Sequence, residues 1–417
     1  MKNRHHYMHY LMWGCAVLYY LYQYTIRVSP SIMMEDIMMA FNVSAHGFAS
    51  LSALAMYSYA IMQVPAGILT DTFGAKKVIL VSLCSCIIGL TCFACAEDLL
   101  FASIGRIFIG CGSAAAFLSV NKIGTDWFPA GRRAFVFGLT MTAGTVGALN
   151  GGAPLAALNH AVGWRESLFF LAIVGAIILV INLMFLRATP KTITREQNLK
   201  VSEIFSQIKA ALGNVQVFIT GVVALGVYMV ISVLADLWGV AYLMQTYHIA
   251  KTTAAQATSL IYVGLCFGAL VVSWWSDKTH KRKTMIVILS FILVLSLTAF
   301  LHVTNLPFWV SCILLFVVGF CSGAEMLCFA LATEIVPRKI TGTVTGYINA
   351  IVTLGGAFVQ QQVGKMLDHI WCGQCTDDGL RFYTADEYRQ SLSLVIGVVL
   401  FTAVLSLFLK EKKQRSA

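Results

Sequence analysis

Twelve apolar runs, each long enough to cross a lipid bilayer, follow one another along this chain of 417 residues. A helix needs roughly 20 mostly apolar residues to span the hydrocarbon layer. The runs cover residues 10–32, 47–69, 77–96, 100–124, 135–157, 167–187, 214–243, 254–275, 284–302, 307–332, 342–366 and 391–409. The chain is 58% hydrophobic and 12% charged, so a soluble fold could not cover its apolar surface with polar groups. We therefore predict an all-α integral membrane protein with twelve transmembrane helices.

The second constraint is an internal repeat. Asp71 and Asp277 lie 206 residues apart, and each precedes two cations by five and six residues. These cations are Lys76 and Lys77 in the first copy, and Arg282 and Lys283 in the second. At an offset of 208, Asp126 matches Glu334, Gly138 matches Gly346, and Gly147 matches Gly355. We predict two pseudo-symmetric six-helix halves, residues 1–187 and 214–417, joined by a linker at 188–213, as in a two-halved transporter.

The positions of the cations indicate the orientation in the membrane. With the N-terminus in the cytoplasm, 21 of the 29 Lys and Arg residues fall in cytoplasmic segments. This positive-inside pattern explains the net charge of +10 without nucleic acid, and it places both termini in the cytoplasm. The first apolar run lacks a small-residue cleavage site, so we interpret it as a span rather than a removable signal. The linker either lies along the membrane surface as an amphipathic helix or is a solvated connection.

Catalytic and metal-binding signals are weak. Of the 12 cysteines, ten lie in the apolar runs, where a thiol behaves as a small apolar group. Cys372-Gly373-Gln374-Cys375 alone has redox or metal spacing, and an outward-facing disulfide is more plausible there than a metal site. The sequence shows no nucleophile–base pair and no ATP-binding loop. We predict no enzyme activity, no cofactor and no metal, and a gradient as the driving force.

The loop after the second apolar run reads Gly67-Ile68-Leu69-Thr70-Asp71-Thr72-Phe73-Gly74-Ala75-Lys76-Lys77. It resembles the signature of the major facilitator superfamily. The resemblance implies that Gly67, Asp71, Gly74, Lys76 and Lys77 form a gating motif, repeated by Asp277, Arg282 and Lys283. Asp71 would accept hydrogen bonds from a helix N-terminus of the opposite half, and both cations would face lipid headgroups and carboxylates. These contacts would close the cytoplasmic side. The second copy departs from the pattern, since His280 replaces the glycine.

The first apolar run contains the strongest indication of a binding site. Tyr20, Tyr24 and Arg27 are spaced i, i+4 and i+7, which places them on one face of a helix. A guanidinium beside aromatic hydroxyls suits a carboxylate or phosphate. The string from Tyr24 to Ser31 is similar to helix 1 of the anion:cation symporters, in which the arginine grips the substrate anion. The alternative is an arginine that reaches the headgroups, with both tyrosines in packing roles.

Other polar residues inside the apolar runs are candidates for coupling or binding. Glu325 is our candidate for carrying a coupling proton, because an ionised carboxylate at this depth is costly. Arg106 has a family link to proton coupling, but it could instead bind backbone carbonyls for structural reasons. Asp236, beside Trp238, would form a gate or a substrate contact. Four amides could bind substrate or join helices: Asn121, Asn150, Asn349 and Gln360.

We predict a secondary transporter of the major facilitator fold in a bacterial-type inner membrane, working as a monomer. Its function would be proton-coupled uptake of a small organic anion or zwitterion, such as a carboxylate, sugar acid or amino acid, by alternating access. The partners would be the substrate, the proton and the lipid bilayer. Two alternatives stay open: an efflux or siderophore carrier, and a transporter-like sensor. The glycine and proline pattern of drug antiporters is displaced around Gly147 and Pro154, which disfavours efflux.

Overall fold

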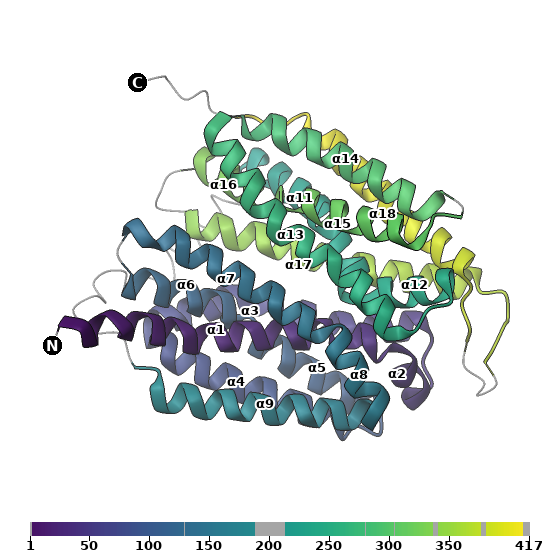
Figure 1. Cartoon of the computed structure of the whole chain (residues 1–417), viewed down its shortest axis with the longest axis horizontal. Helices are drawn as coiled ribbons and strands as arrows, with labels where there is room; N and C mark the ends of the chain where they lie inside the picture. The colour runs from purple at the N-terminus through teal and green to yellow at the C-terminus, as the bar shows by residue number, and fades with distance from the viewer. Residues whose placement is uncertain are drawn as a thin grey trace. The chain divides into compact units, whose positions relative to one another are not determined.

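The computed structural model describes residues 2–128, 130–187, 213–279, 281–303, 305–336, 341–376 and 381–411. Figure 1 shows that these residues are arranged almost entirely as helices. Contacts divide the chain into two compact units, whose described residues fall within 2–187 and 213–411. Apart from Gly213, the predicted linker at 188–213 lies outside the described residues. The exact domain boundaries therefore stay a prediction.

The N-terminal unit is a bundle of long helices with one short surface helix, α2, after the first span. Its elements are α1 (Lys2–Ile32), α2 (Met34–Phe41), α3 (Ala45–Phe73), α4 (Ala75–Ala94), α5 (Leu99–Ser113), α6 (Ala115–Trp127), α7 (Ala130–Gly151), α8 (Ala153–Val162) and α9 (Trp164–Phe185). The sequence did not predict α2. Its Asp36 accepts a hydrogen bond from Asn159 Nδ2 of α8 at 2.8 Å, which ties the short helix to the bundle.

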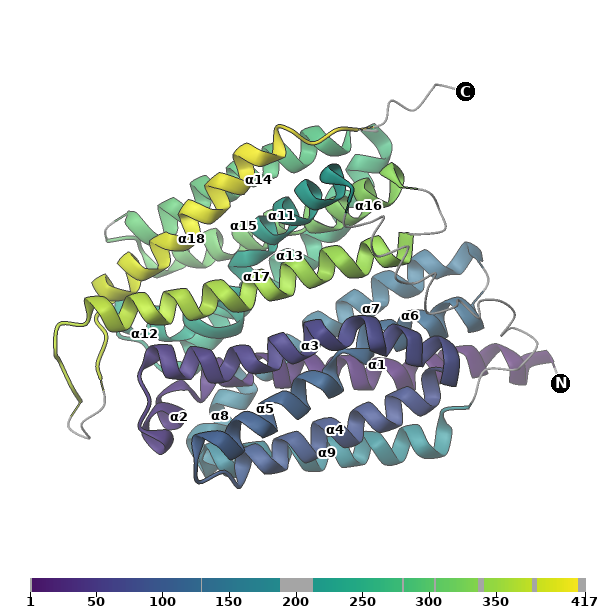
Figure 2. The same ribbon diagram turned by 180° about the vertical axis from the view of Figure 1, so that it is seen from behind.

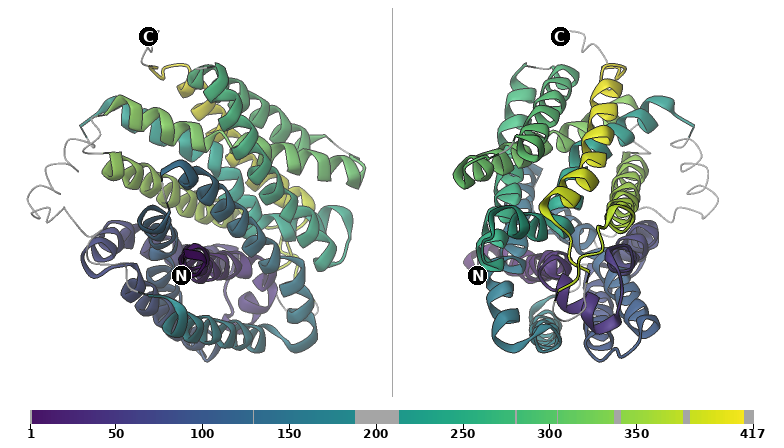
Figure 3. Two further views of the ribbon diagram at one scale, coloured as in Figure 1. Left: turned by 60° about the vertical axis from the view of Figure 1, so that its left-hand side comes forward. Right: turned by 90° about the vertical axis from the view of Figure 1, so that its right-hand side faces the viewer.

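The C-terminal unit is a second helical bundle, seen from behind in Figure 2. Its elements are α11 (Val215–Val230), a π-helix η1 (Ile231–Trp238), α12 (Gly239–Tyr247), α13 (Lys251–Thr279), α14 (Arg282–His302), α15 (Phe308–Ser322), α16 (Glu325–Ile335), α17 (Thr341–Ile370) and α18 (Ala385–Ser406). The helix α18, drawn in yellow, can be followed along its length in Figure 3.

The two units repeat one pattern of helix pairing. In the N-terminal unit α1 packs on α7, α3 on α5, and α4 on α9. In the C-terminal unit the corresponding pairs are α11 with α17, α13 with α15, and α14 with α18. The repeat in the sequence is therefore also a repeat in the internal architecture of each unit.

Local sequence signals set the helix ends. Asn214 begins α11 by accepting hydrogen bonds from the backbone N–H groups of Gln216 and Val217, at 3.0 and 3.3 Å. Thr384 and Glu387 form a capping box at the start of α18. Gly74 separates α3 from α4 with φ at +84°, a conformation that favours glycine. Side chains at such positions supply the hydrogen bonds that the first turn of a helix lacks.

The helices have the length and surface expected in a membrane. Among the described residues, nine stretches are long and apolar enough to span one, and each coincides with a predicted run. The other three runs, 10–32, 135–157 and 342–366, lie in α1, α7–α8 and α17. Exposed apolar side chains such as Ile173 and Ile177 of α9 suit contact with lipid. The count of twelve transmembrane helices remains a prediction.

Glycine residues allow the paired helices to approach closely. A Cβ atom built on Gly319 of α15 would lie 2.0 Å from the Ile261 carbonyl oxygen of α13. In the other unit, one built on Gly89 of α4 would lie 2.7 Å from the Gly105 carbonyl oxygen of α5. Small residues at helix interfaces are typical of membrane bundles, because close packing and interhelical contacts, not exclusion of water, hold the helices together.

Among the described residues, four long apolar segments depart from regular α-helix. The α5–α6 segment is interrupted at Ala114, the α7–α8 segment at Gly152, and the α15–α16 segment at Gly323 and Ala324. The segment from α11 to α12 contains the eight-residue π-helix η1. The hydrophobic periodicity did not predict these departures, because each lies within a continuous apolar run.

Replacing Gly319 with alanine should lower the melting temperature of the purified protein. The added methyl group would force α13 and α15 apart, and overpacking of this kind costs about 1–3 kcal/mol. The matched control is Gly397→Ala on α18, since nothing lies within 4 Å of a Cβ built there. That variant should melt no lower than the wild type, because alanine favours helix over glycine. Equal melting temperatures for both variants would contradict the packing argument.

Candidate functional site

The structure brings together the three predicted residues of α1. The Tyr20 hydroxyl donates a hydrogen bond to the Tyr24 hydroxyl at 3.4 Å, and the ring centroids are 5.1 Å apart. The Arg27 guanidinium carbon lies 5.8 Å from the centroid of the Tyr24 ring. Tyr20 is buried, whereas Tyr24 and Arg27 are half-buried. We call these three residues the helix-1 cluster.

Two glycines of α7 hold the helix-1 cluster in place. A Cβ atom on Gly144 would lie 2.9 Å from the Tyr20 ring, and one on Gly147 would lie 2.2 Å from the Leu21 carbonyl oxygen. The Thr25 hydroxyl donates to the Gly147 carbonyl oxygen at 2.9 Å. Because neither Gly144 nor Gly147 carries a side chain, α1 packs directly against the backbone of α7 at these positions.

The helix-1 cluster has the chemistry of an anion site. A guanidinium offers a planar fork of donors that matches two oxygens of a carboxylate or phosphate. Phenolic hydroxyls can donate further hydrogen bonds to the same anion. The Tyr24 ring beside Arg27 adds cation–π attraction, which helps to orient the guanidinium.

A second cluster forms around η1 in the C-terminal unit. Asp236 is 3% exposed and accepts a hydrogen bond from the Tyr262 hydroxyl of α13. Trp238 Nε1 donates to the Gln360 carbonyl oxygen of α17 at 3.2 Å, and Gln360 Nε2 donates to the Ser232 carbonyl oxygen at 2.5 Å. We call these five residues the π-helix cluster. It joins three predicted residues, Asp236, Trp238 and Gln360.

Sequence reasoning missed Ser232 and Tyr262. Both are ordinary residues in apolar helices, and neither falls in a motif. The sequence signal that could have found them is the carboxylate at Asp236, because a buried carboxylate in a membrane helix requires nearby donors. The π-helix itself has no recognisable sequence signal, although such segments occur often at functional sites.

The three predicted asparagines differ in their burial and in their hydrogen bonds. Asn150 is exposed on α7, and its Nδ2 donates to the Val146 carbonyl oxygen of its own helix at 2.9 Å. Asn121 of α6 has a buried Oδ1 atom without a hydrogen-bond partner among the described residues. Asn349 is half-buried on α17.

Glu325 lies where α16 begins, directly after the interruption at Gly323 and Ala324. It is 5% exposed, so its carboxylate is almost fully removed from solvent. At the interruption the backbone N–H groups of Met326 and Leu327 donate to the Gly323 and Ala324 carbonyl oxygens, at 3.2 and 3.0 Å. The helical backbone therefore continues through tighter turns at the buried Glu325.

Arg106 of α5 is buried and contacts backbone and an aromatic ring. Its Nη2 donates to the Ser52 carbonyl oxygen of α3 at 3.0 Å, and its guanidinium carbon lies 5.7 Å from the Phe93 ring centroid. Its Nε has no hydrogen-bond partner among the described residues. Such a carbonyl contact is what we expect if Arg106 has a structural role rather than a role in proton coupling.

The first copy of the gating motif contacts neighbouring helices of its own unit. A Cβ atom built on Gly67 would lie 3.9 Å from the Leu118 side chain of α6. Lys76 Nζ donates to the Leu183 carbonyl oxygen of α9 at 3.2 Å, and Lys77 is exposed. A cation at a helix C-terminus is favourable because the last carbonyl groups lack partners. The side chain of Asp71 lies outside the described residues.

The second copy forms ion pairs within the C-terminal unit. Arg282 Nη2 lies 2.9 Å from Glu334 Oε1 of α16, and its backbone N–H donates to Glu411 Oε1 at 2.7 Å. Lys283 is half-buried on α14, and the side chain of Asp277 lies outside the described residues. Glu334 is also a member of the internal repeat, so two repeated positions meet in this contact.

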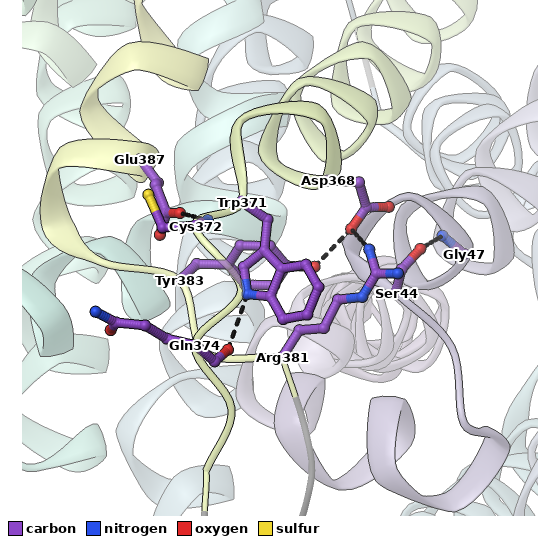
Figure 4. A network of polar contacts seen from close by, with 9 residues as sticks. All are labelled: Ser44, Gly47, Asp368, Trp371, Cys372, Gln374, Arg381, Tyr383 and Glu387. Atoms are coloured by element: carbon purple, nitrogen blue, oxygen red, sulfur yellow. Dashed lines mark hydrogen bonds and ion pairs between the residues drawn. The ribbon is translucent and has the colours of Figure 1, made fainter.

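The segment between α17 and α18 is organised by a network of polar contacts, shown in Figure 4. Asp368 Oδ1 accepts hydrogen bonds from Tyr383 at 2.5 Å and from Arg381 at 3.2 Å. The Cys372 backbone N–H donates to Glu387 Oε1 at 2.7 Å. A hydrogen bond to the Glu387 carboxylate raises the pKa of the exposed Cys372 thiol. Cys372 and Cys375 are both free thiols here.

Comparison with known proteins identifies relatives that are named as transport proteins or as a sensor. The chain is 23% identical to a probable hexose phosphate transport protein of Chlamydia pneumoniae, over 87% of each chain. It is 23% identical to a probable galactarate/D-glucarate transporter of Escherichia coli, over 82% of each. It is also 24% identical to a membrane sensor protein of Salmonella typhimurium, over 86% of this chain and 84% of the relative.

Solved structures show the same fold. A bacterial homologue of the human lysosomal transporter Spinster, in an inward-facing and unoccupied conformation, matches with a TM-score of 0.80. The match covers 98% of this chain and 97% of that one at 15% identity, so it concerns the fold alone.

A sequence profile described as the Major Facilitator Superfamily matches residues 12–360, which is most of the chain. This match confirms the resemblance found in the gating motif, and the relatives agree with its anion:cation symporter branch. The family consists of membrane transporters and not of enzymes. The chain belongs to the Major Facilitator Superfamily and is a multi-pass membrane transporter.

Proposed function

We propose that this protein is a proton-coupled importer of a small organic anion or zwitterion, working by alternating access as a monomer. The observation that supports this most directly is the helix-1 cluster, where Arg27 lies beside the Tyr24 ring and Tyr20 and Tyr24 share a hydrogen bond. Relatives named for hexose phosphate and galactarate or glucarate transport support an anionic substrate. Twelve spans, cytoplasmic termini and a bacterial-type inner membrane belong to the same proposal.

The residues divide into three roles. Arg27 holds the anion and Tyr20 and Tyr24 orient it, while polar side chains of other helices contact the rest of the substrate. These further contacts are Asn121, Asn150, Asp236, Trp238, Asn349 and Gln360. Glu325 carries the coupling proton, because an ionised carboxylate is costly at so buried a position. Arg106 supports coupling from α5, and the gating residues of the two motif copies close the cytoplasmic side.

A transporter-like sensor is the second candidate. The Salmonella typhimurium relative is named a membrane sensor protein and covers most of this chain. A sensor would bind the same class of anion, and loss of the gene would abolish induction of other genes while uptake stayed normal. Measured uptake of the bound compound in proteoliposomes separates the two functions.

Replacing Arg27 should abolish stabilisation by the anionic substrate. A ligand that binds the folded state raises the melting temperature as its concentration passes the Kd. Screening carboxylates, sugar acids, sugar phosphates and amino acids should reveal one anionic class that stabilises the wild type. Removing one partner of a charged contact costs about 2–5 kcal/mol, so Arg27→Ala should weaken binding by roughly 30-fold or more. Arg27→Lys should recover only part of it, because an ammonium lacks the planar fork.

The matched control is Arg165→Lys. Arg165 also lies beside an aromatic ring and donates to a backbone carbonyl, but it belongs to the start of α9. Its ligand-induced stabilisation should equal that of the wild type. Stabilisation that survives in Arg27→Ala, or that appears only with bulky apolar compounds, would argue against anion import and in favour of efflux.

Replacing Glu325 with glutamine should uncouple transport from the proton gradient. Glutamine keeps the shape of the side chain but cannot exchange a proton. In proteoliposomes the variant should lose accumulation driven by a proton gradient, yet keep exchange of labelled for unlabelled substrate. Asp386→Asn serves as the control, since Asp386 is an exposed carboxylate paired with Arg389. Accumulation that persists in Glu325→Gln would place the coupling proton elsewhere.

A further inference from the structure

Two exposed thiols lie three residues apart in the segment between α17 and α18. Cys372 and Cys375 are both exposed, and both are free in the structure. The proposed transport function uses neither of them. Exposed cysteines with this spacing are suited to thiol–disulfide exchange, because one thiol can attack an external disulfide and the other can then displace the product.

The backbone of this segment favours closure of the pair. The chain bends at Gly373, whose φ of +84° is a conformation that favours glycine. Trp371 Nε1 donates to the Gln374 carbonyl oxygen at 2.8 Å and holds the bend, as Figure 4 shows. A tight turn brings the Cα atoms of residues i and i+3 within about 7 Å, and a disulfide joins Cα atoms about 4.4–6.8 Å apart. The fold therefore suits a bond between Cys372 and Cys375.

Hydrogen bonds hold the backbone of both cysteines. The Cys372 N–H donates to Glu387 Oε1 at 2.7 Å, which ties the first cysteine to the start of α18. Cys375 forms an isolated antiparallel bridge with Arg381. The main chain is thus anchored at each cysteine, while the side chains remain exposed.

Glu387 makes the two thiols chemically different. Its carboxylate is held in the capping box of α18, where Oε2 accepts a hydrogen bond from the Thr384 N–H at 2.6 Å. The hydrogen bond to this carboxylate, together with its negative charge, raises the pKa of the Cys372 thiol. Because the thiolate is the attacking form, Cys372 is held back from reaction with an external disulfide. Among the described residues, no carboxylate forms such a contact with Cys375.

We propose that Cys372 and Cys375 form a redox site that exchanges with external disulfides, in which Cys375 attacks first and Cys372 closes the internal disulfide. The site is independent of the transported substrate. In the proposed orientation this segment faces the outer side of a bacterial-type inner membrane, which is an oxidising compartment in which disulfides persist.

The reaction balances in two exchange steps. The Cys375 thiol loses its proton to water, and its sulfur attacks one sulfur of the external disulfide. A mixed disulfide forms, and the first external thiolate leaves and takes up a proton. The Cys372 thiol then loses its proton to water and attacks the Cys375 sulfur, which breaks the mixed disulfide and releases the second external thiolate. Two protein thiols are oxidised, and one external disulfide is reduced to two thiols.

The test uses oxidised glutathione on the purified full-length protein, with mass spectrometry of the peptides to locate each modified cysteine. The wild type should form the internal disulfide. Cys372→Ser should keep a stable glutathione adduct on Cys375, because no second thiol displaces it. Cys375→Ser should form its adduct on Cys372 more slowly, by roughly 3-fold or more. A wild type that stays reduced, or that carries glutathione on both cysteines, would overturn the redox site.

The order of attack is tested by adding Glu387→Gln to Cys375→Ser. Glutamine also serves at this position of a capping box, so α18 should keep its first turn. Removal of the charge should speed the adduct on Cys372 by roughly 3-fold or more. Asp386→Asn in the same background is the matched control, since Asp386 is the neighbouring exposed carboxylate and pairs with Arg389. An unchanged rate with Glu387→Gln, or equal acceleration by both variants, would show that Glu387 does not set the order.

The outward placement has its own measurement. Oxidised glutathione added outside right-side-out membrane vesicles should form the internal disulfide in the wild type. Oxidation that occurs only in inside-out vesicles would overturn the assignment of this site to the outer side.

Discussion

The fold depends on one constraint: within hydrocarbon, every backbone N–H and C=O group must find a partner inside the protein. No water is present there to bind these groups. A chain of this composition therefore folds as helices, in which the backbone groups bind one another. Any departure from regular helix then leaves a polar group that something else must bind. The departures described in this chain are accordingly informative, because each has a polar residue beside it.

The departures in the C-terminal unit show how this constraint brings polar side chains next to irregular backbone. At η1 the Gln360 side chain of α17 donates to the Ser232 carbonyl oxygen. At Gly323 and Ala324 the backbone N–H groups donate to carbonyl oxygens three residues back, directly before the buried Glu325. Backbone irregularity and buried polar side chains therefore occur together in this unit.

Close packing supplies the rigidity that the proposed anion site needs. The contact of α1 with α7 is possible because Gly144 and Gly147 carry no side chain, and it holds Tyr20 and Tyr24 against each other. The pairing of α13 with α15 in the other unit uses Gly319 in the same way. A transporter must move large bodies while preserving the geometry within each, and tightly packed helix pairs meet this requirement.

The sequence by itself determined the class of the protein. Apolar run length and the repeated Asp71 and Asp277 loops indicated a helical, two-halved membrane transporter, because hydropathy and an internal repeat are properties of the chain alone. The i, i+4, i+7 spacing also placed Tyr20, Tyr24 and Arg27 on one face, since helical periodicity is local. Tertiary structure alone decided that Asp236 meets Tyr262, that Gln360 meets Ser232, and that Glu325 begins a helix. Those outcomes depend on packing between segments far apart in sequence and on a change of helical register, and local periodicity records neither.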